Sequence, residues 1–260
     1  MIEIKDFEGY LRRMQNGMDD KLWWVPLSDH KTIVDYGCAD GTLLRHIREI
    51  HPDYNLIGVD ISPDMLRVAK ATVPNCTFMT VDEFFACGRD FSDAILILSS
   101  VIHEIYSYCP DAEDVMHKLL TKGFAAIAIR DMCVSDNTEG VNVDYATYKL
   151  VAENTDYKMV ADFARYYGYP YSQKQFVHYL LKYRYLDNWE REVAENYLPV
   201  NLEPLLNMLS EYYQIERLHH YTLPFLQECI RNDFGFELRT PTHVKILLTA
   251  KDGGNYEEKL

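Results

Sequence analysis

The amino-acid sequence predicts an α/β fold in which helices cover both faces of a mostly parallel sheet. Two observations support this prediction. Apolar runs of strand length alternate with segments of helical periodicity through the first half of the chain, and strands that are apolar throughout are typical of sheets buried on both faces. In addition, 260 residues exceed a minimal domain but are few for two independent ones, so we expect a single core with a large insertion.

An amphipathic helix comes first, since apolar and aromatic side chains recur at helical spacing over residues 6–20. The largely apolar run 32–36 predicts the first strand, and the helix that follows it over 43–50 ends before Pro52. The same alternation continues with strands at 55–60, 76–80, 92–98 and 124–129, and with helices at 63–72 and 112–120. The last two strands are expected at 214–222 and 243–251, on either side of a helix at 224–232.

A long tyrosine-rich region of helical character separates the fifth and sixth expected strands. It adds no strand of its own, so we interpret it as a cap inserted over the sheet. The predicted organisation is an N-terminal helix and ligand-binding core over residues 1–131 and a helical cap over 132–211. C-terminal strands over 212–260 then complete a seven-stranded sheet.

Charge and cysteine content restrict the functional classes. The formal net charge of −14 repels anionic membranes and phosphate backbones. The apolar run 94–102 is too short to span a bilayer, and the first residues do not have the pattern of a secretory signal. The six cysteines lack CxxC spacing, and the pair His219 and His220 has no third ligand at usable spacing. We therefore expect a cytoplasmic protein with no membrane partner and no metal site.

A glycine-containing turn follows the first strand in the run Val34-Asp-Tyr-Gly-Cys-Ala-Asp-Gly41. Glycine permits a tight strand-to-helix turn whose backbone approaches a ligand closely. The second strand ends in Asp60, about twenty residues after the turn, where a ribose-binding carboxylate is expected. Together these two features predict a cofactor that contains a ribose, bound at the carboxyl ends of the strands.

Both a nicotinamide dinucleotide and S-adenosylmethionine fit such a turn, and charge distinguishes them. A dinucleotide fingerprint has three glycines, because the pyrophosphate rests on the helix N-terminus. Here only Gly37 and Gly41 are present, and Asp40 places a carboxylate where the pyrophosphate would lie. The sulfonium and amino groups of S-adenosylmethionine instead favour nearby carboxylates such as Asp35 and Asp40. The charges therefore favour S-adenosylmethionine.

At these residues the sequence resembles the class I S-adenosylmethionine-dependent methyltransferases, whose first motif reads hydrophobic-Asp-hydrophobic-Gly-x-Gly-x-Gly. Ala39 replaces the middle glycine. The resemblance covers roughly residues 31–131 and, more loosely, the last two strands, which it implies are an antiparallel addition to a Rossmann-like sheet. It implies S-adenosylmethionine as cofactor and a cofactor site made of Asp35, Gly37, Cys38, Gly41, Asp60, Ile61, Asp82 and Ser99.

The resemblance also implies individual roles within that site. Asp60 would bond the ribose hydroxyls, Ile61 would pack on the adenine, Asp82 would contact the adenine amino group, and the backbone at Ser99 would meet the methionine part. Structural alternatives stay open for three of the residues. Asp35 can simply orient the turn, Asp82 can be a helix N-cap, and Ser99 can cap the next helix.

Methyl transfer from a sulfonium is a direct displacement that depends mainly on positioning. A general base helps where the acceptor is a protonated hydroxyl or amine. His103 and its neighbour Glu104 follow the fourth strand and are the predicted catalytic residues, with a surface helix start as the alternative for both. Arg130 and Asp131, at the end of the fifth strand, are candidate substrate contacts, with a cap of the following loop as the alternative for Asp131.

Part of the predicted cap is basic, although the chain as a whole is acidic. Residues 163–185 contain no acidic residue, but they contain four basic residues and many tyrosines. If residues 172–185 form a helix, Lys174, His178 and Lys182 make one basic stripe. Such a surface is suited to phosphates and stacked bases. The alternative is a lid helix with a solvated basic face and with tyrosines packed on the sheet.

These patterns predict an enzyme that transfers a methyl group from S-adenosylmethionine to an oxygen or nitrogen atom. The expected acceptor is a small or nucleotide-like molecule enclosed by the cap. An RNA methyltransferase that uses the 163–185 surface is one alternative. A non-catalytic cofactor-binding subunit is another, because no Asn-Pro-Pro-Tyr-type motif follows the fourth strand. The oligomeric state is not predicted.

Overall fold

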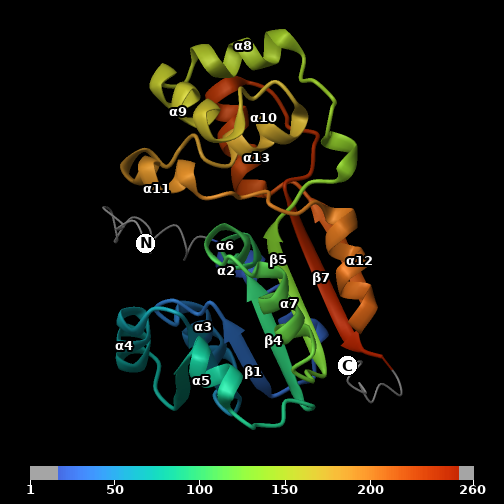
Figure 1. The fold of residues 1–260 in the computed structure, drawn as a ribbon. Helices are drawn as coiled ribbons and strands as arrows, with labels where there is room; N and C mark the ends of the chain where they lie inside the picture. The colour runs from blue at the N-terminus through green and yellow to red at the C-terminus, as the bar shows by residue number, and fades with distance from the viewer. Residues whose placement is uncertain (1–16, 252–260) are drawn as a thin grey trace.

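Figure 1 shows the computed structural model of the protein, which describes residues 17–251. Most of the helix predicted over residues 6–20 lies outside the described residues, and the part inside them forms helix α2 (Met18–Lys21). A single 3-10 turn, η1 (Val25–Leu27), leads from there to the first strand.

Seven strands form one sheet in the order β3-β2-β1-β4-β5-β7-β6. Their bounds are β1 (Thr32–Tyr36), β2 (Asn55–Asp60), β3 (Cys76–Thr80), β4 (Ala94–Ser99), β5 (Ala126–Met132), β6 (Tyr213–Tyr221) and β7 (His243–Ala250). Strands β1 to β5 pair in parallel, whereas β7 is antiparallel to both β5 and β6. This arrangement confirms the predicted seven-stranded, mostly parallel, Rossmann-like sheet.

Six helices pack on the sheet besides α2. They are α3 (Thr42–Ile50), α4 (Pro63–Thr72), α5 (Val81–Ala86), α6 (Ile102–Tyr108), α7 (Ala112–Leu120) and α12 (Leu202–Tyr212). Local sequence sets their ends, as at α4, where the Ser62 hydroxyl accepts the N–H of Met65 and Pro63 takes the first position. Within residues 17–251 no helix has the length and the apolar character needed to cross a bilayer.

Apolar side chains of the central strands alternate between two cores. In β4, Leu96 and Leu98 point into the core that contains α5, α6, α7 and α12. Ile95 and Ile97 point into the other core, which contains α2, α3 and α4. Because both faces of the parallel strands are covered, these strands are continuous apolar runs in the sequence.

A third apolar cluster forms the cap, toward which β4 and β5 point (Figure 1). Its elements are α8 (Tyr145–Glu153), α9 (Tyr157–Tyr167), α10 (Gln173–Leu180), α11 (Trp189–Ala194) and α13 (Pro224–Phe234), with the 3-10 turns η2 (Asp136–Thr138) and η3 (Leu186–Asn188). The structure departs from the expected cap of residues 132–211 at two helices. Leu205 and Leu209 of α12 are buried against the sheet, whereas Leu226 and Ile230 of α13 are buried in the cap.

Candidate functional site

The glycine turn predicted after β1 is present and tightly packed. Gly37 and Gly41 have φ angles of +82° and +77°, a region that favours glycine. The N–H groups of Gly37 and Cys38 both donate to the Val59 carbonyl, at 2.8 and 3.0 Å, which ties the turn to β2. A Cβ atom at Gly37 would lie 2.6 Å from Cγ2 of Val101. Glycine is therefore required here for steric as well as conformational reasons.

Replacing Gly37 with alanine should lower the free energy of unfolding by about 1–3 kcal/mol, because the added methyl group meets Val101 in a strained backbone conformation. Urea unfolding at equilibrium measures this loss. Gly88→Ala is the matched control, since a Cβ atom at Gly88 would meet nothing within 4 Å and its φ angle is ordinary. Equal stability of the two variants would contradict the steric account of the turn.

Asp60, at the end of β2, holds the turn in place. Its two carboxylate oxygens accept hydrogen bonds from the N–H groups of Ala39 and Ser62, each at 2.8 Å. Burial raises the pKa of this carboxyl, and the two N–H donors oppose that rise. A carboxylate offers about four lone-pair sites, so both oxygens can still accept a hydroxyl donor. The side chain of Ile61 is 67% exposed, which leaves an apolar surface beside the carboxylate.

The Asp40 carboxylate occupies the N-terminus of α3. It accepts a hydrogen bond from the N–H of Thr42 at 3.1 Å and another from the Thr42 hydroxyl at 2.8 Å. A pyrophosphate bound in the dinucleotide manner needs this helix N-terminus. The geometry therefore disfavours a dinucleotide and agrees with a ligand that carries positive charge near the turn.

Two polar groups at the carboxyl ends of β1 and β4 lack a hydrogen-bond partner among residues 17–251. The Asp35 carboxylate is buried without a hydrogen bond, and burial raises its pKa to about 7. The Ser99 hydroxyl is also buried without a partner, so it does not cap α6. Buried polar groups are normally hydrogen-bonded. The two groups therefore fit a ligand at this edge, and a cationic ligand group would stabilise charged Asp35.

Cys38 and Asp82 lie in contrasting surroundings. The Cys38 side chain is buried in the core, so only its backbone can face a cofactor. Asp82 is exposed in the first turn of α5. The N-cap of that helix is Thr80, whose hydroxyl accepts the N–H of Glu83 in a capping box. The alternative interpretation of Asp82 as the N-cap is therefore wrong, and its contact with adenine stays a prediction.

His103, the predicted general base, is buried between two carboxylates. Its Nδ1 lies 2.7 Å from Oδ1 of Asp131, and its Nε2 lies 3.0 Å from Oε1 of Glu195. Burial alone would lower the pKa of this imidazole, but the Asp131 charge and the two hydrogen bonds raise it to about 10. Both ring nitrogens then carry protons, so neither can accept one. The geometry argues against a general base at His103, and its burial also excludes a surface helix start.

An ionic cluster surrounds His103 and joins the core to the cap, with His103 and Glu195 buried and Glu104 partly exposed. Nη2 of Arg191, from α11, lies 3.7 Å from Glu104 and 3.4 Å from Glu195. Ligand atoms of His103, Glu104 and Glu195 lie within 4.8 Å of one another, as they would around a metal ion. Arg191 and His103 already supply positive charge there. No local motif marks Arg191 or Glu195, which is why sequence reasoning missed both.

Glu104 remains the better placed of the two predicted catalytic residues. Burial raises the pKa of its carboxyl to about 7, with attraction to His103 and Arg191 acting in the opposite direction. A base with a pKa near the working pH is suited to proton transfer. Its catalytic role stays a prediction.

Asp131 and Arg130, the two candidate substrate contacts at the end of β5, form hydrogen bonds within the protein. Oδ2 of Asp131 accepts the N–H of Ile102 at 2.7 Å, so Asp131 caps α6 rather than the following loop. Arg130 donates to the Asp20 carboxylate and to the Ser100 hydroxyl, both at 2.8 Å. Both residues are buried. The structure thus gives each a role in fixing the walls of the site, and contact with an acceptor stays a prediction.

Lys182 does not belong to a basic surface. It follows the end of α10 at Leu180, and its side chain is fully buried. The ammonium group donates to the Glu195 carbonyl at 2.6 Å and lies 3.3 Å from the centre of the Tyr197 ring. Burial lowers the pKa of Lys182 to about 7.

The other members of the expected stripe are also engaged within the protein. His178 is buried, and its Nε2 accepts the N–H of Tyr197 at 3.1 Å. Lys174 forms an ion pair with Glu139 at 3.0 Å. The basic stripe of Lys174, His178 and Lys182 is therefore not formed at the surface, and its interpretation as a solvated basic face is wrong. Use of the wider 163–185 surface by RNA stays a prediction.

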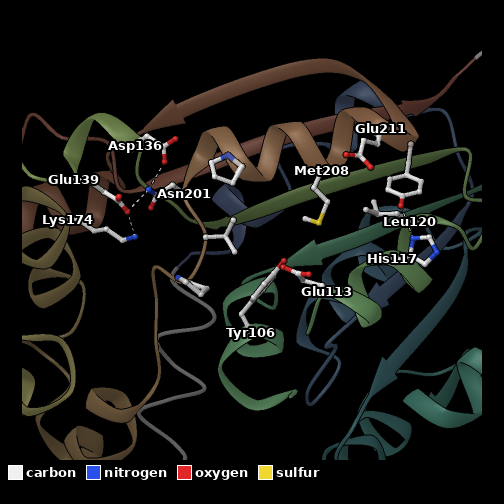
Figure 2. Close-up of a pocket in the computed structure, with 14 residues that line it drawn as sticks. Tyr106, Glu113, His117, Leu120, Asp136, Glu139, Lys174, Asn201, Met208 and Glu211 are labelled. Atoms are coloured by element: carbon white, nitrogen blue, oxygen red, sulfur yellow. Dashed lines mark hydrogen bonds and ion pairs between the residues drawn. The ribbon is translucent and has the colours of Figure 1, made fainter. Parts of the chain in front are cut away.

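A cleft of about 660 Å³ lies between α7, α12 and the cap (Figure 2). At one end Asn201 donates to Asp136 at 2.7 Å and to Glu139 at 2.8 Å, beside Lys174. Aromatic, acidic and apolar side chains line the rest. Lys174 is the only predicted site residue in its lining, so this cleft is separate from the glycine turn.

Residues 33–123 match a family model described as a methyltransferase domain. The trans-aconitate 2-methyltransferase of Azoarcus sp. (strain BH72) is 40% identical over 101 residues, which are 39% of this chain and 38% of that protein. The trans-aconitate 2-methyltransferase of Escherichia coli (strain SE11) is 33% identical over 58 residues, which are 22% of this chain and 23% of that protein. The matches thus span less than half the length of these curated relatives.

Two solved structures share the fold at low sequence identity. An S-adenosylmethionine-dependent methyltransferase from Mesorhizobium loti is 18% identical with a TM-score of 0.54, over 90% of this chain and 100% of that one. A TehB-like S-adenosylmethionine-dependent methyltransferase from Corynebacterium glutamicum is 11% identical with a TM-score of 0.50, over 94% and 97%. These likenesses agree with the α/β fold expected from the sequence.

Proposed function

We propose that residues 33–123, which match a family model described as a methyltransferase domain, form a class I domain that binds S-adenosylmethionine, and that the protein is an enzyme that methylates an oxygen or nitrogen atom. The acceptor is a small or nucleotide-like molecule enclosed by the cap. One observation carries the proposal. The turn held by Asp60 lies at the same edge of the sheet as the buried carboxylate of Asp35, which accepts no hydrogen bond from residues 17–251.

The residues at this edge fit S-adenosylmethionine in chemistry as well as in place. Asp60 keeps lone pairs for the ribose hydroxyls, and exposed Ile61 offers an apolar surface for the adenine. Asp35 offers negative charge to the sulfonium and the amino group. When bound, the cofactor supplies an electrophilic methyl group on a sulfonium sulfur.

The protein contributes mainly position and exclusion of water. The turn at Gly37 fixes one reactant, and the cap closes the space beyond β4 and β5, so the acceptor atom can be held in line with the methyl group. Glu104 takes the proton of a hydroxyl or amine acceptor, since its pKa of about 7 suits that step. A carboxylate acceptor, such as the one named for the Azoarcus relative, needs no base.

The side chains of the cap select the acceptor. The segment that matches the family model, residues 33–123, does not include the cap. A small acceptor is favoured over RNA because Lys182 and His178 are buried and the net charge is −14. A cytoplasmic location belongs to the same proposal, since all six cysteines are free thiols.

Calorimetry with S-adenosylhomocysteine, the demethylated cofactor, tests the proposal directly. We expect one site per chain with a dissociation constant between about 1 µM and 1 mM, the range usual for enzyme ligands. Radiolabelled methyl transfer in a cell extract should then yield a small labelled product. Absence of binding would overturn the cofactor assignment, and binding without any transfer would favour a non-catalytic subunit.

A further inference from the structure

Helix α2 is fixed against the sheet by the carboxylate of Asp20. Its Oδ2 accepts a hydrogen bond from Nε of Arg130 at 2.8 Å and another from the Tyr221 hydroxyl at 2.7 Å. Its Oδ1 lies 2.6 Å from Nζ of Lys245. The three donors come from β5, β6 and β7. A helix of four residues is not stable alone, so these contacts set its position.

Apolar packing holds the same segment on both sides of Lys21. Met18 and Trp24 are buried in the core that contains α3 and α4. The backbone of Lys21 therefore lies at one defined place, between the anchored Asp20 and the buried Trp24.

The ammonium group of Lys21 has no hydrogen bond or ion pair within residues 17–251. Loss of hydration and repulsion by Arg130 lower its pKa, while Asp35, Asp40 and Glu104 act in the opposite direction. The charge of Lys21 in turn opposes the rise that burial causes in the pKa of Asp35. The ammonium group thus interacts electrostatically with Asp35, near the end of β1, and with Asp40 in the glycine turn.

Lys21 and Asp35 present opposite charges, neither of them hydrogen-bonded within the described chain, to the same edge of the sheet. The amino-acid end of S-adenosylmethionine carries one ammonium and one carboxylate group. Resting on the function proposed above, we propose that Lys21 binds the carboxylate of the cofactor's methionine part, while Asp35 faces its cationic groups.

Lys21 suits this task better than the other cations near it. Arg130 and Lys245 are bound to Asp20, and moving either toward a ligand would release α2. An anionic group of the acceptor is the competing partner of Lys21. The cofactor is favoured because Asp35, whose carboxylate interacts electrostatically with Lys21, lies near the end of β1, two residues before Gly37 of the glycine turn.

The test compares two ligands that differ only in the amino-acid part. Calorimetry measures the affinity of the protein for S-adenosylhomocysteine and for methylthioadenosine, which lacks the carboxylate. Lys21→Met should weaken S-adenosylhomocysteine binding by about 10- to 100-fold, the value of one charge-assisted hydrogen bond. Binding of methylthioadenosine should not change, and Lys21→Arg should keep most of the affinity for S-adenosylhomocysteine.

Lys31→Met is the matched control. It removes the same charge from an exposed lysine, paired with Asp53 at 3.5 Å, directly before β1 and so at the opposite edge of the sheet. Both affinities should stay as in the unmodified protein. Unchanged binding of S-adenosylhomocysteine by Lys21→Met, or an equal loss for both ligands, would overturn the inference alone. Failure of the unmodified protein to bind S-adenosylhomocysteine would overturn the proposed function with it.

Discussion

Replacing His103 with alanine is expected to lower the free energy of unfolding by about 3–5 kcal/mol, the cost of breaking a buried ion pair by removing one partner. The Asp131 and Glu195 carboxylates are both buried and share this one imidazolium. Asp131 keeps the N–H groups that it caps, whereas Glu195 loses its contact with the imidazole at the start of α6 and keeps the hydrogen bond from the Tyr108 hydroxyl at the end of that helix. Chemical denaturation at equilibrium measures the loss.

The effect of His103 should depend on pH with a defined sign. The pKa of its imidazole is about 10 in the folded protein against a usual value of 6.5, so its contribution is complete below pH 6.5 and disappears as the pH rises through about 10. The difference in stability between the unmodified protein and His103→Gln should therefore shrink over that range. Lys182 also titrates in this pH range, but it is present in both proteins, so its contribution cancels when the two free energies of unfolding are subtracted.

His117→Ala serves as the control for this variant. His117 is an exposed histidine of α7 whose Nδ1 lies 2.7 Å from the Tyr212 hydroxyl. Its loss should change the free energy of unfolding by less than about 1 kcal/mol. A loss of the same small size at His103 would show that the ionic cluster does not stabilise the junction of core and cap.

Asp60→Ala is expected to weaken the binding of S-adenosylhomocysteine by at least about 100-fold. Two hydrogen bonds to a charged group are worth about 3 kcal/mol or more, and each 1.4 kcal/mol is a factor of ten. The variant also releases the N–H groups of Ala39 and Ser62, which loosens the turn. Isothermal titration calorimetry gives the affinity.

Asp53→Ala removes the same charge from an exposed position before β2 and should leave the affinity unchanged. Asp60→Asn separates the two roles of the carboxylate, because an amide keeps one acceptor oxygen. We expect its affinity to lie between those of Asp60→Ala and the unmodified protein. Retention of full affinity by Asp60→Ala would remove this residue from the cofactor site.

The elements that could be predicted are those that local sequence determines. Strands β2 and β3 and helices α4 and α7 have the predicted bounds, because apolar runs and helical spacing lie within a few consecutive residues. The glycine turn and Asp60 were found for a similar reason, since one short motif and one fixed spacing mark them. Asp40 was also read correctly as a carboxylate at the helix N-terminus.

The interactions that sequence reasoning missed join residues far apart in the chain. Glu195 meets His103, and Arg191 meets Glu104, only because the cap folds back onto α6. No periodicity in the sequence indicates these contacts. Lys182 was expected at the surface because lysine usually lies there. In the structure its ammonium group is buried, where it donates hydrogen bonds to two backbone carbonyls and lies against the Tyr197 ring. Burial of a charge depends on its partners, which only the tertiary structure supplies.

The position of β7 between β5 and β6 has a consequence for folding. Residues 243–250 must be present before β6 can join the sheet, and they pair with residues 126–132 across a long stretch of chain. Long-range pairing of this kind slows folding, because the entropy of closing a large loop is lost before the stabilising contacts form. Helix α13 links β6 to β7 and packs in the cap. The cap and the sheet are therefore completed by the same late segment of the chain during synthesis. Until then the edge of β5 stays open to pairing with other chains, which makes the late stage of synthesis the one most exposed to aggregation.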